Sequence, residues 1–178
     1  LLMACTLTSC SLDILPENAQ TYDTSFNNEA GVNSATASVE YFLNIYAPNN
    51  NTFCTVGMFV DTLQDDMEIR RWNPRRVIGQ NQSWKELYDI VFSANVIVDN
   101  IHRAKDLRDD RRNHYLGQAE FGLGFCYFLL AQRFDDAVIT ENSQVIKEYA
   151  TSSRIDVINA AIDHATKAFN MLPTYDKL

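Results

Sequence analysis

Cys10 is the residue of this chain whose chemistry is easiest to anticipate. Residues 7–10 read Leu-Thr-Ser-Cys and end an apolar run that starts at Leu1. This arrangement resembles a bacterial lipobox, in which a peptidase cuts before the cysteine and the thiol then carries a lipid. We therefore expect residues 1–9 to be the remnant of a lipoprotein signal peptide and Cys10 to be lipidated. A short core helix and an ordinary cleaved signal peptide are the alternatives, but the cysteine lies where apolar sequence gives way to polar sequence, which favours lipidation.

A second group of chemically capable residues lies at 70–76, which read Arg-Arg-Trp-Asn-Pro-Arg-Arg. A flat indole can cover the apolar side of a sugar ring while polar side chains reach its hydroxyls. Trp72 with Asn73, flanked by Arg70 and Arg75, is therefore the candidate ligand-binding site, and the arginines would favour an acidic sugar. The alternative is a solvated basic loop that pairs with the acidic residues before it. That alternative suits the arginines better than Trp72, because an indole between charged residues has no obvious core to join.

Catalysis and metal binding are not indicated by the motifs. His102, His114 and His164 have no Ser or Cys nucleophile motif beside them, and no CxxC or HExxH spacing is present. The acidic stretch 61–68 lacks the glycine and the spacing of an EF-hand loop. We therefore expect no enzymatic activity, no cofactor and no structural metal. A glycosidase pair of carboxylates is defined by a spatial separation that sequence does not supply.

Composition is typical of one folded domain. The chain has 178 residues, of which 46% are hydrophobic, and a formal net charge of −8. The acidic balance argues against nucleic acid as a partner. Beyond the signal segment no apolar run approaches the ~20 residues that a membrane-spanning helix needs. A Cys54–Cys126 disulfide stays open, although the apolar surroundings of Cys126 favour a core position.

Four segments carry apolar residues at helical spacing. The expected helices are 27–46, capped by Asn27 or Asn28; 83–101, opened by a capping box at Ser83; 109–133, capped by Asp109 or Asp110; and 153–172, capped by Ser153. Residues 10–26 are expected to form an extended tether, and 27–178 a mostly helical, all-α domain with long irregular loops. The short connection at 105–109 predicts antiparallel packing of the two central helices.

Burial expectations follow from the same periodicity. The third helix is apolar on all sides at 121–130 and is expected to be central, with Gly117, Gly122 and Gly124 tolerated where another helix crosses closely. Asn95 falls on the buried stripe of the second helix and must find hydrogen-bond partners there. The buried stripe of the first helix is expected to include Phe42 and to end at Tyr46, which with 49–51 is a second, weaker ligand candidate. The face of the last helix expected to be buried consists of Val157, Ile158, Ala161, Ile162, Ala165, Ala168, Phe169 and Leu172.

Taken together, these pieces resemble the N-terminal part of SusD/RagB-type nutrient-binding outer-membrane lipoproteins. The matching features are the cysteine and Leu-Asp-x-x-Pro tether at 10–16, the Trp-x-x-Leu-Tyr helix starting at Trp84, the aromatic helix starting with Ala119, and the terminal helix ending in Leu172-Pro173. Two departures occur: Gly-Leu-Gly at 122–124 replaces the usual Leu-Arg-Ala, and Phe-Asp-Asp-Ala-Val at 134–138 replaces Phe-Gly-Asp-x-Pro. These departures concern the packing of the third expected helix and the turn that follows it.

The resemblance implies a fold of tetratricopeptide-like helix pairs in a chain truncated at both ends. It also implies capture of glycans, or less often other nutrients, at the cell surface and delivery to a TonB-dependent (SusC-like) transporter in the outer membrane. Two other functions are carried as alternatives: a helical-repeat lipoprotein that acts as a protein–protein scaffold, and a carbohydrate-active hydrolase.

Overall fold

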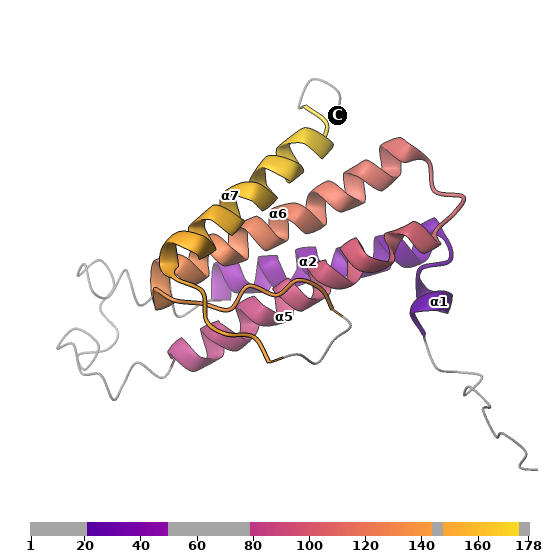
Figure 1. The fold of residues 1–178 in the computed structure, drawn as a ribbon. Helices are drawn as coiled ribbons and strands as arrows, with labels where there is room; N and C mark the ends of the chain where they lie inside the picture. The colour runs from indigo at the N-terminus through magenta and orange to yellow at the C-terminus, as the bar shows by residue number, and fades with distance from the viewer. Residues whose placement is uncertain (1–20, 50–78, 144–147, 175–178) are drawn as a thin grey trace, which may run out of the picture.

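The computed structural model describes residues 21–49, 79–143 and 148–174, and the regular elements in these ranges are helices (Figure 1). They are α1 (Tyr22–Ser25), α2 (Glu29–Asn49), α5 (Gly79–Asn100), the 3-10 turn η2 (Ile101–Arg103), α6 (Asp109–Phe134) and α7 (Arg154–Met171). One isolated antiparallel bridge joins Ala137 to Ser152. The expected all-α architecture is therefore confirmed. None of the described helices is long and apolar enough to cross a bilayer.

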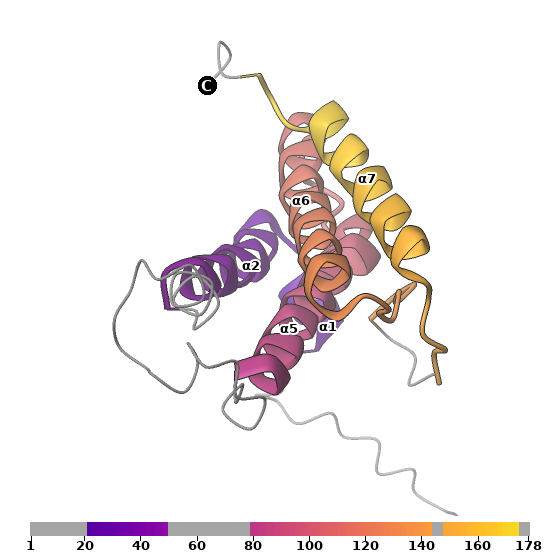
Figure 2. The ribbon, with the colours of Figure 1, turned by 90° about the vertical axis from the view of Figure 1, so that its left-hand side faces the viewer.

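The chain direction reverses from each long helix to the next, so that α2 and α5, α5 and α6, and α6 and α7 are each antiparallel (Figure 1). Viewed along the bundle, α6 lies in the middle, with α7 on one side, α2 on the other and α5 below (Figure 2). Antiparallel packing of α5 and α6 was predicted from their short connection, and Arg112 holds that turn together. Its guanidinium donates to the carbonyls of Ile101, Ala104 and Leu107 at 2.8, 2.9 and 3.1 Å.

Helix starts were predicted with mixed success. The Asn28 side chain accepts from the amide of Gly31 at 3.0 Å, and Ser153 accepts from the amide of Asp156, so these two caps are confirmed. The capping box at Ser83 is wrong because α5 already begins at Gly79. The cap of α6 is Arg108, which makes no side-chain cap hydrogen bond. Asp109 and Asp110, predicted as caps, instead lie in the first turn of α6, where the positive end of the helix dipole stabilises a carboxylate.

Two boundaries at the N-terminal side also differ from expectation. The extended tether predicted through residue 26 is interrupted by α1, which has a capping box at Thr21, and Phe26 is buried in the core at 2% exposure. Helix α2 continues past Tyr46 to Asn49. Residue 48 is a proline, which at this point costs only one backbone hydrogen bond near the helix end.

The core is formed by all four long helices. Its largest fully buried side chains are Tyr127, Leu87, Ile90, Ile97, Leu123, Leu130, Val32, Val39, Val91, Val157, Asn100 and Cys126. The predicted core position of Cys126 is confirmed: its thiol is free, and burial raises its pKa well above the ordinary value. Asn95 is 6% exposed and donates to Thr140 Oγ1 at 2.9 Å, as its place on the buried stripe required.

The segment that follows α6 is tied to α5 and α6 by side-chain hydrogen bonds. The Tyr88 hydroxyl donates to the Val138 carbonyl at 2.8 Å and accepts from the Val138 amide at 2.7 Å. The Thr140 amide donates to the Tyr127 hydroxyl at 3.0 Å. Asp99 accepts from the backbone amide and the hydroxyl of Ser143, both at 2.7 Å. Side chains of α5 and α6 therefore satisfy much of the backbone of this segment, in addition to the bridge between Ala137 and Ser152.

Tyr88→Phe is expected to change how the free energy of unfolding depends on pH in the alkaline range. Burial raises the pKa of Tyr88 to about 12, so the folded state keeps its proton while the unfolded chain loses it near the ordinary value of 10.0. The resulting stability is fully present below pH 10 and is lost as pH rises towards 12. Tyr88→Phe should cost about 1–3 kcal/mol at pH 7, because both backbone groups of Val138 lose their partner. It should also lose less stability than wild type between pH 9 and 12 in urea titrations. Parallel losses in both proteins would contradict this assignment.

Helix α6 ends at a strained residue. Asp135 has φ 66° and ψ −83°, a conformation that L residues rarely adopt and glycine adopts freely. This is the position at which the resembled family usually carries glycine. The Asp135 carboxylate is 3.4 Å from Arg154 Nη1, but both side chains are more than half exposed, so the ion pair contributes little.

Asp135→Gly is therefore expected to raise the free energy of unfolding by about 1 kcal/mol, the relief of strain exceeding the added entropy of the unfolded chain. Asp135→Ala is the control, because it removes the carboxylate and keeps the strain. Urea unfolding of the two variants and wild type measures the difference. Equal stability of the glycine and alanine variants would count against backbone strain at this position.

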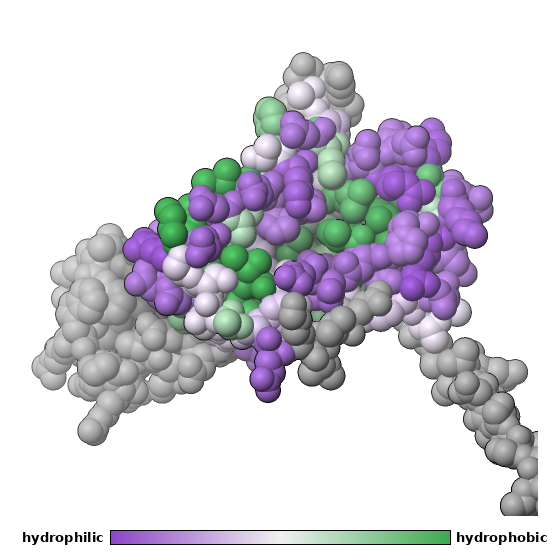
Figure 3. Space-filling model, in the orientation of Figure 1, coloured by the Kyte–Doolittle hydropathy of each residue, from purple (hydrophilic) through white to green (hydrophobic). Residues whose placement is uncertain are grey.

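Part of the surface predicted to be buried is exposed. On α7, Ile162 and Phe169 are 57% and 80% exposed and Ala165 is also exposed, although Val157, Ala161 and Ala168 are buried as predicted. On α6, Phe121 and Phe128 are each 51% exposed, so this helix is not packed on all sides within the described structure. Phe42 of α2 is exposed at 36%. Figure 3 shows apolar side chains along the upper edge of α7, within an otherwise largely hydrophilic face.

Candidate functional site

The residues that the sequence singled out for ligand binding lie outside the described part of the chain. Trp72, Asn73, Arg70 and Arg75 fall between α2 and α5, and Cys10 precedes α1. Their assignments stay predictions. The described residues instead form a different concave site, which sequence periodicity did not indicate.

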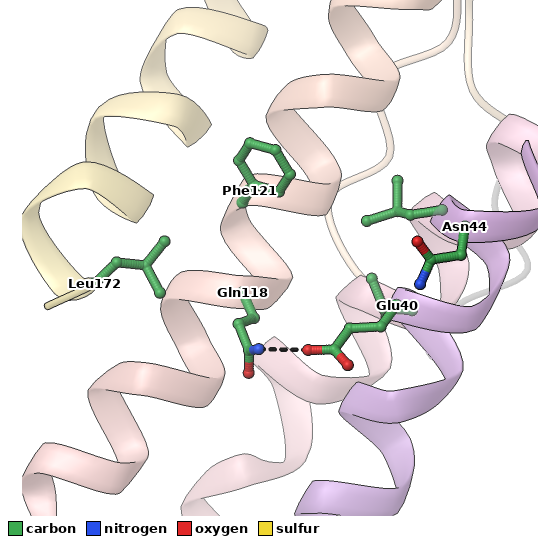
Figure 4. Close-up of a pocket in the computed structure, with 7 residues that line it drawn as sticks. Glu40, Asn44, Gln118, Phe121 and Leu172 are labelled. Carbon is green, nitrogen blue, oxygen red and sulfur yellow. Dashed lines mark hydrogen bonds between the residues drawn. The ribbon is translucent and has the colours of Figure 1, made fainter. Parts of the chain in front are cut away.

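A cavity of about 310 Å³ opens between α2 and α6 and is bounded at one end by the residue after α7 (Figure 4). Its lining residues are Val39, Glu40, Leu43, Asn44, Gln118, Phe121 and Leu172. Helix α2 contributes one wall through positions four residues apart, 40 and 44 among them, which lie on one helix face. Helix α6 contributes the opposite wall.

The polar part of this cavity is a short chain of carboxylate and amide groups. Gln118 Nε2 donates to Glu40 Oε1 at 2.5 Å across the gap between the two helices. This bond leaves the second Glu40 oxygen and the Gln118 carbonyl oxygen as further acceptors. In Figure 4 the Asn44 side chain lies on the same wall as Glu40, one turn along α2. Side chains of this kind exchange hydrogen bonds with the hydroxyls of a polyol without requiring a charged ligand.

The apolar part is dominated by Phe121. Its ring is half exposed and is stacked near-parallel to that of Phe125, with centroids 6.1 Å apart and an interplanar angle of 15°. Leu172 closes the far side of the cavity (Figure 4). An exposed aromatic ring beside convergent hydrogen-bonding groups is the combination that suits a molecule with one apolar and one polar side, such as a pyranose.

Two glycines of α6 allow the walls to come this close. A Cβ atom at Gly122 would lie 3.0 Å from Val39 Cγ1, and one at Gly117 would lie 2.7 Å from Leu172 Cγ. A larger residue at either position would displace a side chain that lines the cavity. The expectation that the glycines mark close helix crossings is confirmed here and at Gly124, where a Cβ would lie 3.0 Å from the backbone nitrogen of Ala165.

A separate buried cluster joins α6 to α7. Glu120 is 5% exposed, and its Oε2 lies 2.5 Å from His164 Nδ1. Lys167 Nζ is 4.0 Å from the other Glu120 oxygen. The His164 ring stacks on Tyr127 with centroids 5.6 Å apart. His164 therefore contributes to the contact between α6 and α7.

The polar groups of the cavity are hydrogen-bonding amide and carboxylate side chains. Among the described residues that line the cavity, Glu40 is the single carboxylate, whereas glycoside hydrolysis ordinarily uses a pair. Within the described ranges, no group of three or more His, Cys, Asp or Glu side chains is arranged to hold a metal ion.

Comparisons with known proteins agree with one another. A family model described as SusD-like, starch-binding and associating with the outer membrane matches residues 11–177. A SusD-like protein of Formosa agariphila is 24% identical over 76 residues, which are 43% of this chain and 14% of that protein. The crystal structure of a SusD-like carbohydrate-binding protein from Bacteroides fragilis superposes with a TM-score of 0.61 at 15% identity, covering 86% of this chain and 33% of that one. The described chain thus spans about a third or less of the length of these relatives.

Proposed function

Because the chain belongs to the SusD-like family, whose members are described as starch-binding and associating with the outer membrane, we propose that it is a non-catalytic glycan-binding lipoprotein of the cell surface. In this proposal Cys10 carries the lipid anchor, and the helical body captures oligosaccharides and passes them to a TonB-dependent transporter. The observation that carries the proposal is the family match over residues 11–177, which begins at the residue after Cys10.

The cavity between α2 and α6 is our candidate for a glycan contact on the described surface. Phe121 would stack on the apolar face of a sugar ring, while Glu40, Asn44 and Gln118 would exchange hydrogen bonds with its hydroxyls. A neutral ring suits this cavity, because the Glu40 carboxylate would repel an anionic group. An acidic sugar would instead fit the arginines of 70–76, so the charge of the ligand distinguishes the two candidate sites.

Phe121→Ala is expected to weaken retention of the protein in glycan-containing native gels roughly tenfold, since stacking on an aromatic ring contributes about 1–1.5 kcal/mol. Phe92→Ala is the matched control: Phe92 is 52% exposed, almost the same as Phe121, but lies on α5 and does not line the cavity. The first glycan to test is starch, followed by uncharged and acidic polysaccharides. Equal retention of both variants would remove the cavity from the binding site, while leaving the Trp72 candidate to be tested by Trp72→Ala.

The proposed anchor is tested separately from the ligand. Expression in a bacterium that processes lipoproteins, with radiolabelled or alkyne palmitate, should label the wild-type protein and place it in the outer-membrane fraction. Cys10→Ala should abolish both labelling and membrane association. A labelled Cys10→Ala protein, or an unlabelled wild type, would contradict lipidation at this residue.

A further inference from the structure

A row of three phenylalanines continues along α6 from the cavity between α2 and α6. Phe121, Phe125 and Phe128 follow one another at spacings of four and three residues, which place them on one face of the helix. Phe121 and Phe128 are each 51% exposed, and the ring of Phe125 lies near-parallel to that of Phe121. This phenylalanine row lies on the helix that is flanked by α2 and α7 (Figure 2).

Phe121 lines two depressions at once. One is the cavity of about 310 Å³ that it shares with Glu40 and Gln118. The other is a depression of about 280 Å³ between α6 and α7, whose α7 wall includes Ile158 and Ile162 and whose lining is apolar throughout. Because one ring lines both, the two depressions form a continuous valley along α6, with hydrogen-bonding groups at one end and an apolar lining at the other.

The polar end of this valley is closed by Leu172, the C-cap residue of α7 (Figure 4). Its side chain packs into the space that Gly117 leaves on α6, where a Cβ atom would lie 2.7 Å from Leu172 Cγ and 2.9 Å from Leu172 Cδ2. The Leu172 amide also donates to the Ala168 carbonyl at 2.9 Å, which holds the residue in place. In the opposite direction the valley continues along α6 to Phe128. A ligand in the cavity can therefore extend in one direction along α6.

We propose that the valley binds the end of an unbranched neutral glucan chain, with the terminal sugar in the cavity and the following sugars along the phenylalanine row. This inference rests on the proposed glycan-binding function and adds the length and the direction of the ligand. A terminal sugar carries a free hydroxyl where an internal sugar carries a linkage. Glu40 and Gln118 supply acceptor oxygens at the closed end, where that hydroxyl would lie.

The apolar part of the valley suits the sugars that follow. The phenylalanine row offers contact to the C–H faces of successive rings, while the hydroxyls at the open side stay in water. The wall formed by Ile158 and Ile162 has no hydrogen-bonding side chain. A sulfate or carboxylate held against it would lose hydration without gaining a partner. The lining therefore favours an uncharged chain over an acidic one.

The test measures affinity against chain length by calorimetry, with the lipid-free protein encoded by the complete gene. The probes are maltose with maltohexaose, laminaribiose with laminarihexaose, and the soluble polymers amylose and laminarin. Wild type should bind at least one hexasaccharide about tenfold more tightly than the matching disaccharide, because the longer chain reaches further aromatic rings. The matching polymer should bind more weakly per sugar unit than the hexasaccharide, because only chain ends enter the closed cavity.

Phe128→Ala removes the ring at the far end of the row. It should lower the affinity for the hexasaccharide about tenfold and leave the affinity for the disaccharide unchanged. Phe92→Ala is the matched control, because Phe92 is 52% exposed on α5 and lines neither depression. It should change neither affinity. If Phe128→Ala does not fold, Phe128→Leu, which keeps apolar volume and removes the ring, is read in the same way.

Binding of neither hexasaccharide by folded wild type would overturn the inference, whereas retention by another polysaccharide would still support the proposed function. Equal affinities for disaccharide and hexasaccharide, or an equal effect of Phe128→Ala on both, would show that the ligand does not extend along the row. A polymer bound as tightly per sugar unit as its hexasaccharide would contradict the closed end. A wild-type dimer in sedimentation experiments that Phe128→Ala, and not Phe92→Ala, converts to monomers would assign the row to a second copy of the chain and overturn the inference.

Discussion

His164→Leu should lower the free energy of unfolding by about 3 kcal/mol at pH 7. Glu120 is buried at the α6–α7 contact, and His164 Nδ1 is its nearest partner at 2.5 Å. Leucine would fill much of the same volume but would leave the carboxyl group without that hydrogen bond. Lys167 is a weaker partner, because its ammonium is 4.0 Å from Glu120 Oε1 and its side chain is 54% exposed. Chemical unfolding monitored by circular dichroism measures the loss.

A double-mutant cycle separates the pair from its surroundings. Glu120→Leu should also be destabilising, whereas the double variant Glu120→Leu/His164→Leu should be much closer to wild type, because neither buried polar group is then left alone. If the double variant loses the sum of the two single losses, the contact between Glu120 and His164 does not stabilise the fold as described.

Gly124→Val is expected to be similarly damaging, with a loss of about 3 kcal/mol. A Cβ at this position would already lie 3.0 Å from the Ala165 nitrogen and 3.1 Å from the Ala161 carbonyl oxygen, both of which are backbone atoms that cannot rotate away. Two further methyl groups would force α7 away from α6.

The cost of a β-branched residue in a helix must be separated from this steric effect. Gln132→Val introduces the same residue at an exposed position of α6 and should cost about 0.5 kcal/mol. Gly124→Ala should fall between the two variants, because its gain in helix propensity partly offsets a single close contact. A Gly124→Val protein as stable as Gln132→Val would show that the crossing of α6 and α7 is looser than described.

These two predictions concern features that the sequence indicated only in part. The three glycines in an apolar helix predicted close crossings, and the structure has them at Gly117, Gly122 and Gly124. The contact between Glu120 and His164 was not anticipated, since it joins residues 44 positions apart on two helices whose relative rotation periodicity does not define.

Helix caps were predicted correctly where the capping side chain directly precedes the helix, and wrongly where a cap-like sequence lies inside a longer helix. Asn28 and Ser153 cap as expected. Ser83 has the sequence of a capping box, yet the backbone is already helical four residues earlier.

Helix periodicity identified the apolar residues correctly, but it did not distinguish a helix face that is buried within the described structure from one that is exposed. Ile162 and Phe169 were therefore placed in the core with Val157 and Ala161, although they lie on the adjacent stripe.

The candidate site could not be read from the sequence for a similar reason. Gln118 and Glu40 are 78 residues apart and meet only because α2 packs against α6. Phe121 belongs to an apolar run and was assigned to the core, and nothing local marks it as exposed. The family was nevertheless recognisable from the order of the Cys10 tether, the Trp84 helix and the Leu172-Pro173 ending.

The central claim, that this protein binds glycans, is tested most directly by isothermal titration calorimetry. The lipid-free protein encoded by the complete gene would be titrated with a panel of neutral and acidic oligosaccharides. We predict saturable binding of at least one of them, and we expect the circular dichroism spectrum of the protein to be the same with and without that oligosaccharide. A folded protein that releases no heat with any member of the panel, and is not retained by the corresponding polysaccharides, would contradict the account.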